Sequence, residues 1–367
     1  MKRILHVVGG MDRAGAETMI MNLFRKIDRE EYQFDFVYFR SSKCDYDDEI
    51  LELGGRIFKI KNTKNPIIRA YKLKQLINKE APFHAIHCHM LFSNAFHILS
   101  AYFSKTPMRI SHSHNTSDVN SKTFIGRSYQ TFSRSIMAKF STHFIACGEK
   151  AGEFLFPKIE NINYLLNAID VKSFSDNRSK NRNYIKEELK FDKETIVITQ
   201  IGRLAPVKNH KFTIEFANYL KNKNVKFKII IVGQGVLKDE LMALVAKNKL
   251  DDEVKFLGVR SDIPDILAGS DLMIMPSFHE GFPVVLVESQ STGVPSLISN
   301  SISPEVDLGL NLVNFASLDD DLSIWENKMM QLINESKVDS NRIIDVMTQK
   351  GFNIVESARK LAKIYGE

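Results

Sequence analysis

The chain of 367 residues is too long for one typical core, and its length suggests two domains. Hydrophobic residues make up 44% of it and charged residues 26%, a balance that excludes an intrinsically disordered chain. Nowhere do about 18 apolar residues run together, which excludes a helix that spans a bilayer.

The N-terminal segment MKRILHVVGG is expected to form a buried strand. It does not resemble a signal peptide, because Gly-Gly ends a short apolar run. Cys44, Cys88 and Cys147 lack regular spacing, which favours a reducing compartment over a disulfide framework. Together these features predict a cytoplasmic protein.

The net charge of +6 is unevenly distributed. The residues up to Asp170 hold 24 Lys and Arg against 17 Asp and Glu, whereas the remainder holds 26 against 27. A solvated lysine-rich surface explains the excess, and so does contact of the N-terminal domain with the anionic inner face of the cell membrane. No recognised binding motif accompanies the charge, so we expect no nucleic-acid partner.

Short apolar runs alternate with amphipathic segments along the first half of the chain. The runs predicted to be strands are Ile4–Val8, Phe34–Phe39, Arg56–Ile60, Ala85–His89, Arg109–His114, His143–Cys147 and Ile162–Asn167. Helical periodicity lies between them, for example at Ala16–Ile27 and Ile67–Asn78. This alternation predicts βαβ units around a parallel sheet.

The alternation breaks at the polar segment 173–190, which we interpret as a linker with a short helix. It restarts in strands predicted at Thr195–Gly202, Lys228–Gly233, Val254–Gly258, Leu272–Pro276 and Pro295–Ser299. The sequence therefore predicts an α/β fold with two doubly wound, Rossmann-like domains, residues 1–172 and 191–350. Residues 351–367 are expected to form a C-terminal helix that could pack back on the N-terminal domain.

Ligands of open parallel sheets bind at the carboxyl ends of strands, and a glycine-containing loop follows the first predicted strand. It contains Gly9, Gly10 and Gly15 and opens a helix. Glycines let a backbone approach a phosphate, and helix amides attract an anion, although a tight turn without function is an alternative. The G-x-G-x-x-G spacing is absent and Arg40 stands where a ribose-binding acid is expected, which disfavours a dinucleotide oxidoreductase.

A second candidate loop, Gly202–Asn209, follows the first strand of the second domain and reads G-R-L-A-P-V-K-N. Arg203 offers a planar fork and Lys208 a point charge, and two such groups five positions apart on one loop can clamp a diphosphate. Two surface bases are the alternative, weakened because both follow an apolar strand that ends in glycine.

The third candidate, Ser277–Glu288, is the most specific. Pro283 suits the first turn of a helix, which places Glu280 in the preceding loop and Glu288 inside the helix. Glu288 interrupts an apolar helix, where a carboxylate is costly unless it faces a partner. Sugar and ribose hydroxyls are such partners, and the first helix amides could receive a phosphate.

Glu280 and Glu288, with seven residues between them, match the E-x7-E signature of retaining glycosyltransferases of the GT-B fold. The pattern S-x-x-E-G-F-P-x-V-L-x-E at Ser277–Glu288 resembles glycosyltransferase family four, as do G-R-L-x-x-x-K-N and the opening glycine loop. The resemblance covers nearly the whole chain in the family's motif order. It implies two Rossmann-like domains that face each other across a cleft, in an enzyme similar to bacterial capsule or exopolysaccharide glycosyltransferases.

The resemblance assigns the donor-site residues one by one. Arg203 and Lys208 match the pair on the donor diphosphate, Glu280 matches the acid at the donor sugar, and Glu288 matches the acid at the ribose. The further residues implied for donor binding are Gly9, Gly10, Gly15, Gly202, Gly281, Phe282 and Pro283.

On the acceptor side, His114 matches the family's active-site histidine, although His112 lies two residues away on the same strand face and is an alternative. The implied acceptor-side residues are His89, His112, His114 and Asn115, and the implied catalytic residues are His114, Glu280, Arg203 and Lys208.

Histidines gather at the ends of two strands expected to be neighbours, in His87-Cys88-His89 and His112-Ser113-His114. Four imidazoles could bind zinc, but zinc-site spacing motifs are absent, and histidines that line an acceptor site explain them better. Asp45-Tyr46-Asp47 resembles a metal-binding D-x-D but lies in an acidic loop beyond its strand, where a solvated helix start is expected. We therefore expect no required metal.

The segment Ser121–Phe140 combines aromatic and aliphatic residues with Arg127, Arg134 and Lys139. It is expected to be either an ordinary packed helix or a basic amphipathic element that contacts a membrane. The second interpretation would suit a lipid-linked acceptor.

The expected reaction transfers a sugar from a nucleoside diphosphate, with UDP expected from the family's habits, to a glycan or lipid-linked acceptor. The resemblance implies retention at the anomeric carbon, without a cofactor. The alternatives are a non-catalytic protein that binds sugar nucleotides or polysaccharide, and an epimerase or phosphorylase of the same fold.

Overall fold

The computed structural model describes residues 1–60, 65–118 and 123–367, which divide into two compact units. The first unit comprises Met1–Ile169 and Asn353–Glu367, and the second comprises Asp170–Phe352. The C-terminal residues thus belong to the same unit as the N-terminal domain.

Each unit is built on one fully parallel sheet. The first sheet has the order β3-β2-β1-β4-β5-β6-β7. Its strands are β1 (Lys2–Val8), β2 (Tyr32–Tyr38), β3 (Ile57–Lys59), β4 (Ala85–Cys88), β5 (Met108–Ser113), β6 (His143–Ala146) and β7 (Ile162–Tyr164). The order reverses between β1 and β4, and that point is where doubly wound sheets bind ligands.

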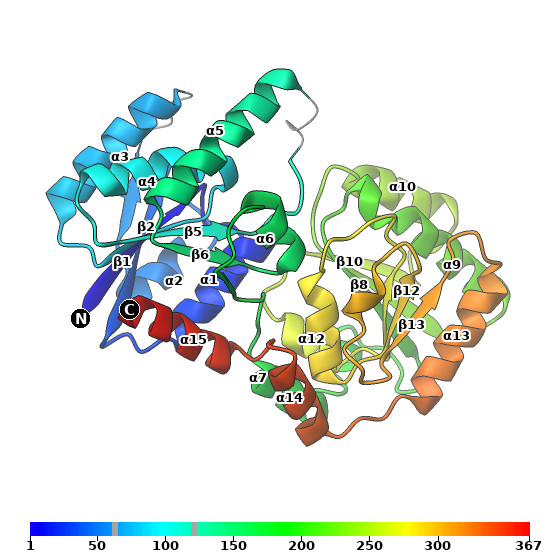
Figure 1. The fold of residues 1–367 in the computed structure, drawn as a ribbon. Coiled ribbons are helices and arrows are strands. Elements are labelled where there is room, and N and C mark those ends of the chain that lie inside the picture. The colour runs from blue at the N-terminus through cyan, green and yellow to red at the C-terminus, as the bar shows by residue number, and fades with distance from the viewer. Residues whose placement is uncertain (61–64, 119–122) are drawn as a thin grey trace. The chain divides into compact units, whose positions relative to one another are not determined.

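Helices cover both faces of the first sheet (Figure 1). Its helices are α1 (Gly15–Lys26), α2 (Asp47–Glu52), α3 (Pro66–Glu80), η1 (Leu91–Ser93), α4 (Asn94–Phe103), α5 (Phe124–Phe140), α6 (Glu149–Leu155) and α15 (Ile354–Gly366). Side chains alternate along β1 and β2, so Ile4 and Phe34 pack with α1 and α15. Leu5 and Val37 point to the opposite face, toward α3 and α4.

The second sheet has the order β10-β9-β8-β11-β12-β13 and reverses between β8 and β11. Its strands are β8 (Ile196–Ile201), β9 (Phe227–Val232), β10 (Val254–Gly258), β11 (Leu272–Met275), β12 (Ser296–Ser299) and β13 (Val313–Ala316). The helices of this unit are α7 (Val171–Lys180), α8 (Tyr184–Glu188), η3 (Pro206–Lys208), α9 (His210–Asn222), α10 (Lys238–Lys247), α11 (Ile263–Ala268), α12 (Val284–Thr292), η4 (Pro304–Val306), α13 (Leu322–Glu335) and α14 (Ser340–Gln349). The predicted two-domain α/β architecture is confirmed.

The structure differs from the sequence prediction in two segments. Residues 173–190, predicted to be a linker, belong to the second unit as α7 and α8. Specific contacts attach these polar helices to the second unit. The Arg178 guanidinium donates to the carbonyl of Ala268 at 2.9 Å, and Ile185 is fully buried. Strand β13 was not predicted, because its four residues, V-N-F-A, show no clear apolar run.

Helix α15 completes the core of the first unit. Asn353 caps it by accepting from the amide of Val355, and the Ile354 amide donates to the carbonyl of Ile169. Leu361 and Tyr365 are fully buried against the residues of β1, β2 and α1. The first sheet therefore depends on a helix that is nearly two hundred residues away in the chain.

We expect Leu361→Ala to lower the free energy of unfolding of the first unit by about 2–5 kcal/mol, because it leaves a cavity beneath the sheet. Chemical denaturation followed by far-UV circular dichroism measures the change. The fluorescence of Trp325, the sole tryptophan, reports the second unit separately. The exposed Lys363→Ala is the matched control, and an equal effect of both substitutions would contradict this account of α15.

Candidate functional site

Two loops of the second unit meet at the point where its strand order reverses. One loop follows β8 and contains Gly202–Asn209, and the other follows β11 and contains Ser277–Pro283. The Phe278 amide donates to the carbonyl of Val207 at 2.9 Å and ties the loops together. Side chains from two distant segments are thereby held beside each other at the carboxyl edge of the sheet.

Lys208 and Glu280 form an ion pair between these loops, with 2.7 Å between Nζ and Oε1. Both side chains are largely buried, 19% and 11% exposed. Gln200 donates from Nε2 to the carbonyl of Lys208 and fixes the loop. A Cβ on Gly202 would lie 3.4 Å from Cε of Lys208, and the φ of +155° favours glycine, so Gly202 leaves the path of the lysine open.

Two glycines that the sequence analysis did not select support this loop. A Cβ on Gly233 would lie 2.0 Å from the carbonyl oxygen of Gly202, and one on Gly235 would lie 2.3 Å from that of Leu204. The loop after β9 therefore packs backbone against backbone on the loop after β8. The signal was present as Gly-Gln-Gly directly after a strand.

Arg203 lies on the same loop but outside the ion pair. Its side chain is exposed, and within residues 1–60, 65–118 and 123–367 no group bonds its guanidinium. The two predicted diphosphate ligands thus differ: Lys208 is held by Glu280, whereas Arg203 is open to a ligand.

Helix α12 begins directly after Pro283, which is its N-cap and not, as predicted, a residue of its first turn. Gly281 and Phe282 precede it and are exposed, and the Phe282 ring stacks on Phe352 with centroids 5.3 Å apart. The first amides of α12 lack intrahelical partners and suit an anion.

Glu288 lies on the second turn of α12, half-buried among apolar neighbours. Burial raises the pKa of its carboxyl to about 7, because desolvation disfavours the charged form. A ligand that donates hydrogen bonds to this carboxylate would restore the charge.

The glycine loop after β1 belongs to the first unit, where it packs against the Arg40 side chain. A Cβ on Gly10 would lie 2.9 Å from the Arg40 side chain, which pairs with Asp12. Gly9 is exposed, and Gly15 is the first residue of α1. The structure thus places these three glycines in a different unit from Lys208 and Glu280, and it groups them with the acceptor-side histidines.

The carboxylates of Asp45-Tyr46-Asp47 have separate partners. Asp45 accepts from the amide of Arg13 at 2.9 Å, while the buried Asp47 pairs with Lys59 at 3.0 Å and begins α2. Asp47 begins a helix, as the sequence analysis expected, but it is buried and not solvated, and Asp45 precedes the helix.

The acceptor-side histidines lie at the carboxyl ends of β4 and β5, which are adjacent strands. His89 Nδ1 lies 2.8 Å from His114 Nε2, and the two rings stack on each other. His112 bonds His87 instead, with 3.1 Å between Nδ1 and Nε2. Burial lowers the pKa of His114 to about 4 and that of His89 and His112 well below the ordinary value, so the imidazoles are neutral.

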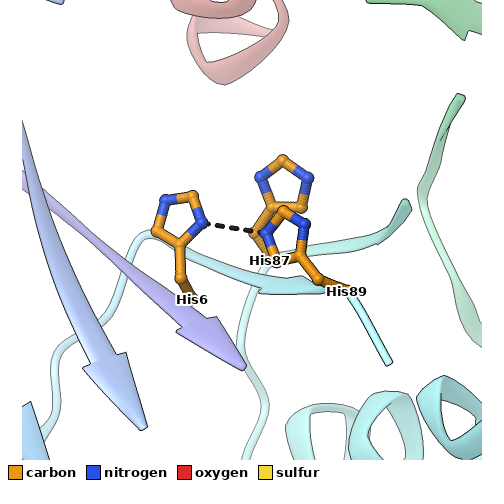
Figure 2. Close-up of side chains that lie close together, drawn as sticks. All are labelled: His6, His87 and His89. Atoms are coloured by element: carbon orange, nitrogen blue, oxygen red, sulfur yellow. Dashed lines mark hydrogen bonds between the residues drawn. The ribbon is translucent and has the colours of Figure 1, made fainter. Parts of the chain in front are cut away.

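Three residues not selected from the sequence extend this cluster. His6 of β1 lies beside His87 and His89 (Figure 2), with 3.0 Å between its Nδ1 and Nε2 of His89. Tyr365 of α15 bonds His87 Nδ1 at 2.8 Å. Asn94 accepts from the amide of Met90 and donates to the carbonyl of Cys88, and it thereby fixes the chain on both sides of His89. Asn115, which follows His114, is exposed.

Comparison with known proteins places this arrangement in a family. The profile of the family described as "Glycosyl transferases group 1" matches residues 181–313, which include both donor-side loops. EpsF of Bacillus subtilis (strain 168), named as a glycosyltransferase, is 35% identical over 370 residues, covering 99% of this chain and 96% of EpsF. An Escherichia coli UDP-Gal:alpha-D-GlcNAc-diphosphoundecaprenol alpha-1,3-galactosyltransferase is 25% identical, covering 96% of this chain and 93% of that enzyme.

Solved structures share the fold. The Anabaena protein Alr3699/HepE in complex with UDP has a TM-score of 0.76 at 16% identity, with all of both chains covered. A glycosyltransferase from Rickettsia africae ESF-5 has a TM-score of 0.78 at 17% identity, covering 99% of this chain and 97% of that chain. Together with the order of the motifs, the full-length similarity to EpsF shows that the chain is a GT-B protein and belongs to the group 1 glycosyl transferases.

Proposed function

We propose that the protein transfers a sugar from a UDP-sugar to a glycan or lipid-linked acceptor in cell-surface polysaccharide synthesis, with retention of configuration. The observation that carries the proposal is the Lys208–Glu280 ion pair at the reversal of the second sheet. The names of relatives support it: the Escherichia coli enzyme uses UDP-Gal and a diphosphoundecaprenol acceptor, and CapH of Staphylococcus aureus is a capsular polysaccharide biosynthesis glycosyltransferase.

In this reaction the bond between the anomeric carbon and the diphosphate oxygen breaks, and a bond to the acceptor oxygen forms on the same face. The acceptor's hydroxyl proton passes to the leaving diphosphate. Lys208, Arg203 and the first amides of α12 are the groups that would stabilise the charge on that leaving group. With these groups in place, the diphosphate needs no Mg²⁺ or Mn²⁺, and we propose that transfer does not depend on either ion.

Donor binding must open the Lys208–Glu280 pair. The diphosphate competes with Glu280 for the Lys208 ammonium, and hydroxyls of the sugar replace the ammonium at the carboxylate. Glu288 would accept hydrogen bonds from the ribose, and Gly281, Phe282 and Pro283 would line the space beneath sugar and phosphates. His114, with His112 as the alternative, would position the acceptor or the sugar.

We expect Lys208→Ala to weaken UDP binding about 10- to 100-fold, because a charge-assisted contact is lost. Glu280→Gln should leave UDP binding equal or tighter, since Lys208 is freed, but slow sugar transfer about 100-fold or more. Calorimetry with UDP and release of UDP from a panel of UDP-sugars measure the two effects.

Lys211→Ala is the matched control, because Lys211 forms an exposed ion pair with Glu240 on the same unit. Unchanged turnover in Glu280→Gln would contradict the role given to Glu280. Tight UDP binding without turnover in the unmodified chain would favour the non-catalytic alternative.

The raised pKa of Glu288 predicts a pH dependence of donor binding. Below about pH 7 the carboxyl is protonated in the free protein, whereas ribose hydroxyls that donate to it favour the ionised form. The affinity for a UDP-sugar should therefore fall as the pH drops from about 8 to about 6. Glu288→Gln should weaken binding about 10-fold at the higher pH and abolish this dependence. A variant that titrates like the unmodified protein in calorimetry would exclude Glu288 as the ribose ligand.

A lipid-linked acceptor requires that the enzyme reach a membrane surface, and the first unit exposes apolar side chains that suit such a contact. Helix α5 buries Gly126 and Met137 but exposes Phe124 and Ile125, 79% and 81% exposed. It is a packed helix with an exposed apolar start, and contact with a membrane stays a prediction. Its predicted first residue, Ser121, lies outside the described residues. None of the helices that the described residues form is long and apolar enough to cross a bilayer.

The neighbouring helices α3 and α4 also carry exposed apolar residues. Helix α4 packs against α3 and α5, and these helices form one layer over the sheet (Figure 1). The exposed apolar side chains of α3 and α4 are Ile67, Ile68, Tyr71, Tyr102 and Phe103. The three helices hold one carboxylate, Glu80, against seven Lys and Arg, which suits an anionic surface.

We therefore propose that this layer makes a peripheral contact with the inner face of the cell membrane. We expect the double variant Phe124→Ser/Ile125→Ser to bind anionic phosphatidylglycerol vesicles at least about 10-fold more weakly than the unmodified protein does. Co-sedimentation with vesicles at low and high salt measures it. The control is Val236→Ser, which removes an 89% exposed apolar side chain from the second unit. Equal vesicle binding by the unmodified protein, the double variant and the control would refute the membrane contact through α5. That result would not bear on the proposed UDP site.

A further inference from the structure

Five imidazoles lie on one face of the first sheet, at the carboxyl ends of three adjacent strands. His6 lies on β1, His87 on β4 and His112 on β5, while His89 and His114 directly follow β4 and β5. His6 and His87 are register partners, and two-residue spacing along each strand keeps the other rings on the same face. Neighbouring ring centroids are 4.0 to 5.2 Å apart.

The ring nitrogens converge in two groups that share His89. One group is His6, His87 and His89 (Figure 2), and the other is His89, His112 and His114. In each group one nitrogen from every ring lies within 4.8 Å of the others. Neutral imidazole is a preferred ligand of zinc, copper and nickel, and burial keeps these rings neutral.

We propose that His89, His112 and His114 bind one divalent transition-metal ion of the zinc type. This group lies at the ends of the strands, where His89 and His114 are only partly buried, so an ion has access and can retain an open position. His6 and His87 are fully buried and lie behind it.

The hydrogen bonds of the cluster supply outer partners for His89 and His112, whereas Nδ1 of His114 is buried without a partner among the described residues. His112 Nε2 is buried without a partner in the described part of the chain, and its Nδ1 faces Nε2 of His87 at 3.1 Å. With Nε2 on the ion, Nδ1–H donates to His87, whose own Nδ1–H donates to Tyr365. His89 binds through Nδ1 and donates from Nε2 to His6 at 3.0 Å. Such partners fix the tautomer and raise ligand basicity.

The three ligand nitrogens lie within 4.8 Å of one another, and one pair of them requires only a small adjustment. His89 Nδ1 and His114 Nε2 are 2.8 Å apart, whereas two nitrogens at about 2.0–2.1 Å from a tetrahedral ion are about 3.3 Å apart. A shift of about half an ångström separates the two arrangements. The sequence predicted no metal because the ligands are 25 residues apart on two strands and form no local spacing motif.

An ion with an open position would bind an oxygen ligand and lower the pKa of a hydroxyl there. That it would be the acceptor hydroxyl rests on the proposed function, whereas binding of the ion does not. The two are therefore tested separately.

The experiment uses full-length, untagged protein treated with a chelator and then dialysed. Calorimetry with Zn²⁺ and the visible absorption bands of tetrahedral Co²⁺ should show one ion per chain. His112→Gln or His114→Gln should weaken Zn²⁺ binding about 100-fold or more, and His6→Gln or His87→Gln about 10-fold, as expected for outer partners. His97→Gln is the control, because His97 is a buried histidine of α4 outside the cluster.

A second measurement needs no variant: Zn²⁺ should raise the melting temperature of the unmodified protein, and a chelator should reverse the rise. Absence of both saturable Zn²⁺ binding and this thermal shift would overturn the proposal and leave a hydrogen-bonded histidine network. Loss of binding in His6→Gln and His87→Gln, with His112→Gln and His114→Gln unaffected, would overturn the assignment of the ligands. UDP calorimetry on the same samples distinguishes either result from failure of the donor site.

Discussion

The Lys208–Glu280 ion pair is the contact on which the donor side depends. It exists because two loops from distant segments meet where the strand order reverses, and because glycines after β8 and β9 allow backbones to touch. A partly buried pair of opposite charges is stable only while each has the other or a replacement. In the proposed reaction a sugar nucleotide supplies both replacements at once, an anion for Lys208 and hydroxyls for Glu280. The pair is neutral as a whole; a diphosphate alone would disrupt it, whereas a complete donor would satisfy both of its charges in the proposed reaction.

Glu288 and the histidines, unlike Lys208 and Glu280, are buried without a partner of opposite charge in the part of the chain that the structure describes. No ion pair compensates for their desolvation, so each is shifted toward its neutral form: the pKa of Glu288 rises, and those of the imidazoles fall. Neutral groups cost less to bury than charged ones and can be charged or coordinated when a ligand arrives. Each unit therefore combines a rigid parallel sheet with polar groups whose state depends on what is bound.

Much of this was predictable from sequence. In this fold parallel strands alternate with helices, so the apolar runs of the sequence predicted twelve of the strands correctly. The residues that follow these strands were therefore placed correctly at the carboxyl edges of the sheets. The E-x7-E and G-R-L-x-x-x-K-N patterns are local and were visible. Whatever depends on contacts between distant segments was not. Tyr365 meets His87 across 278 residues, and the steric need for Gly233 appears only when the Gly202 carbonyl lies against it.

The 173–190 segment shows why polarity alone misleads. Its charged residues suggested a solvated linker, yet Arg178 and Arg182 donate to the carbonyls of Ala268 and Ser270 at the C-terminal end of α11. Burial lowers the pKa of Arg178 to about 10. Arginine buries its stem and satisfies backbone acceptors, so a charged segment can be an integral part of a domain. The same reasoning applies to α5, where an amphipathic pattern is shared by a helix that packs and a helix that binds a surface. The exposure of Phe124 and Ile125 is what the proposed surface contact requires, and exposure is a property of the folded unit, not of the sequence pattern.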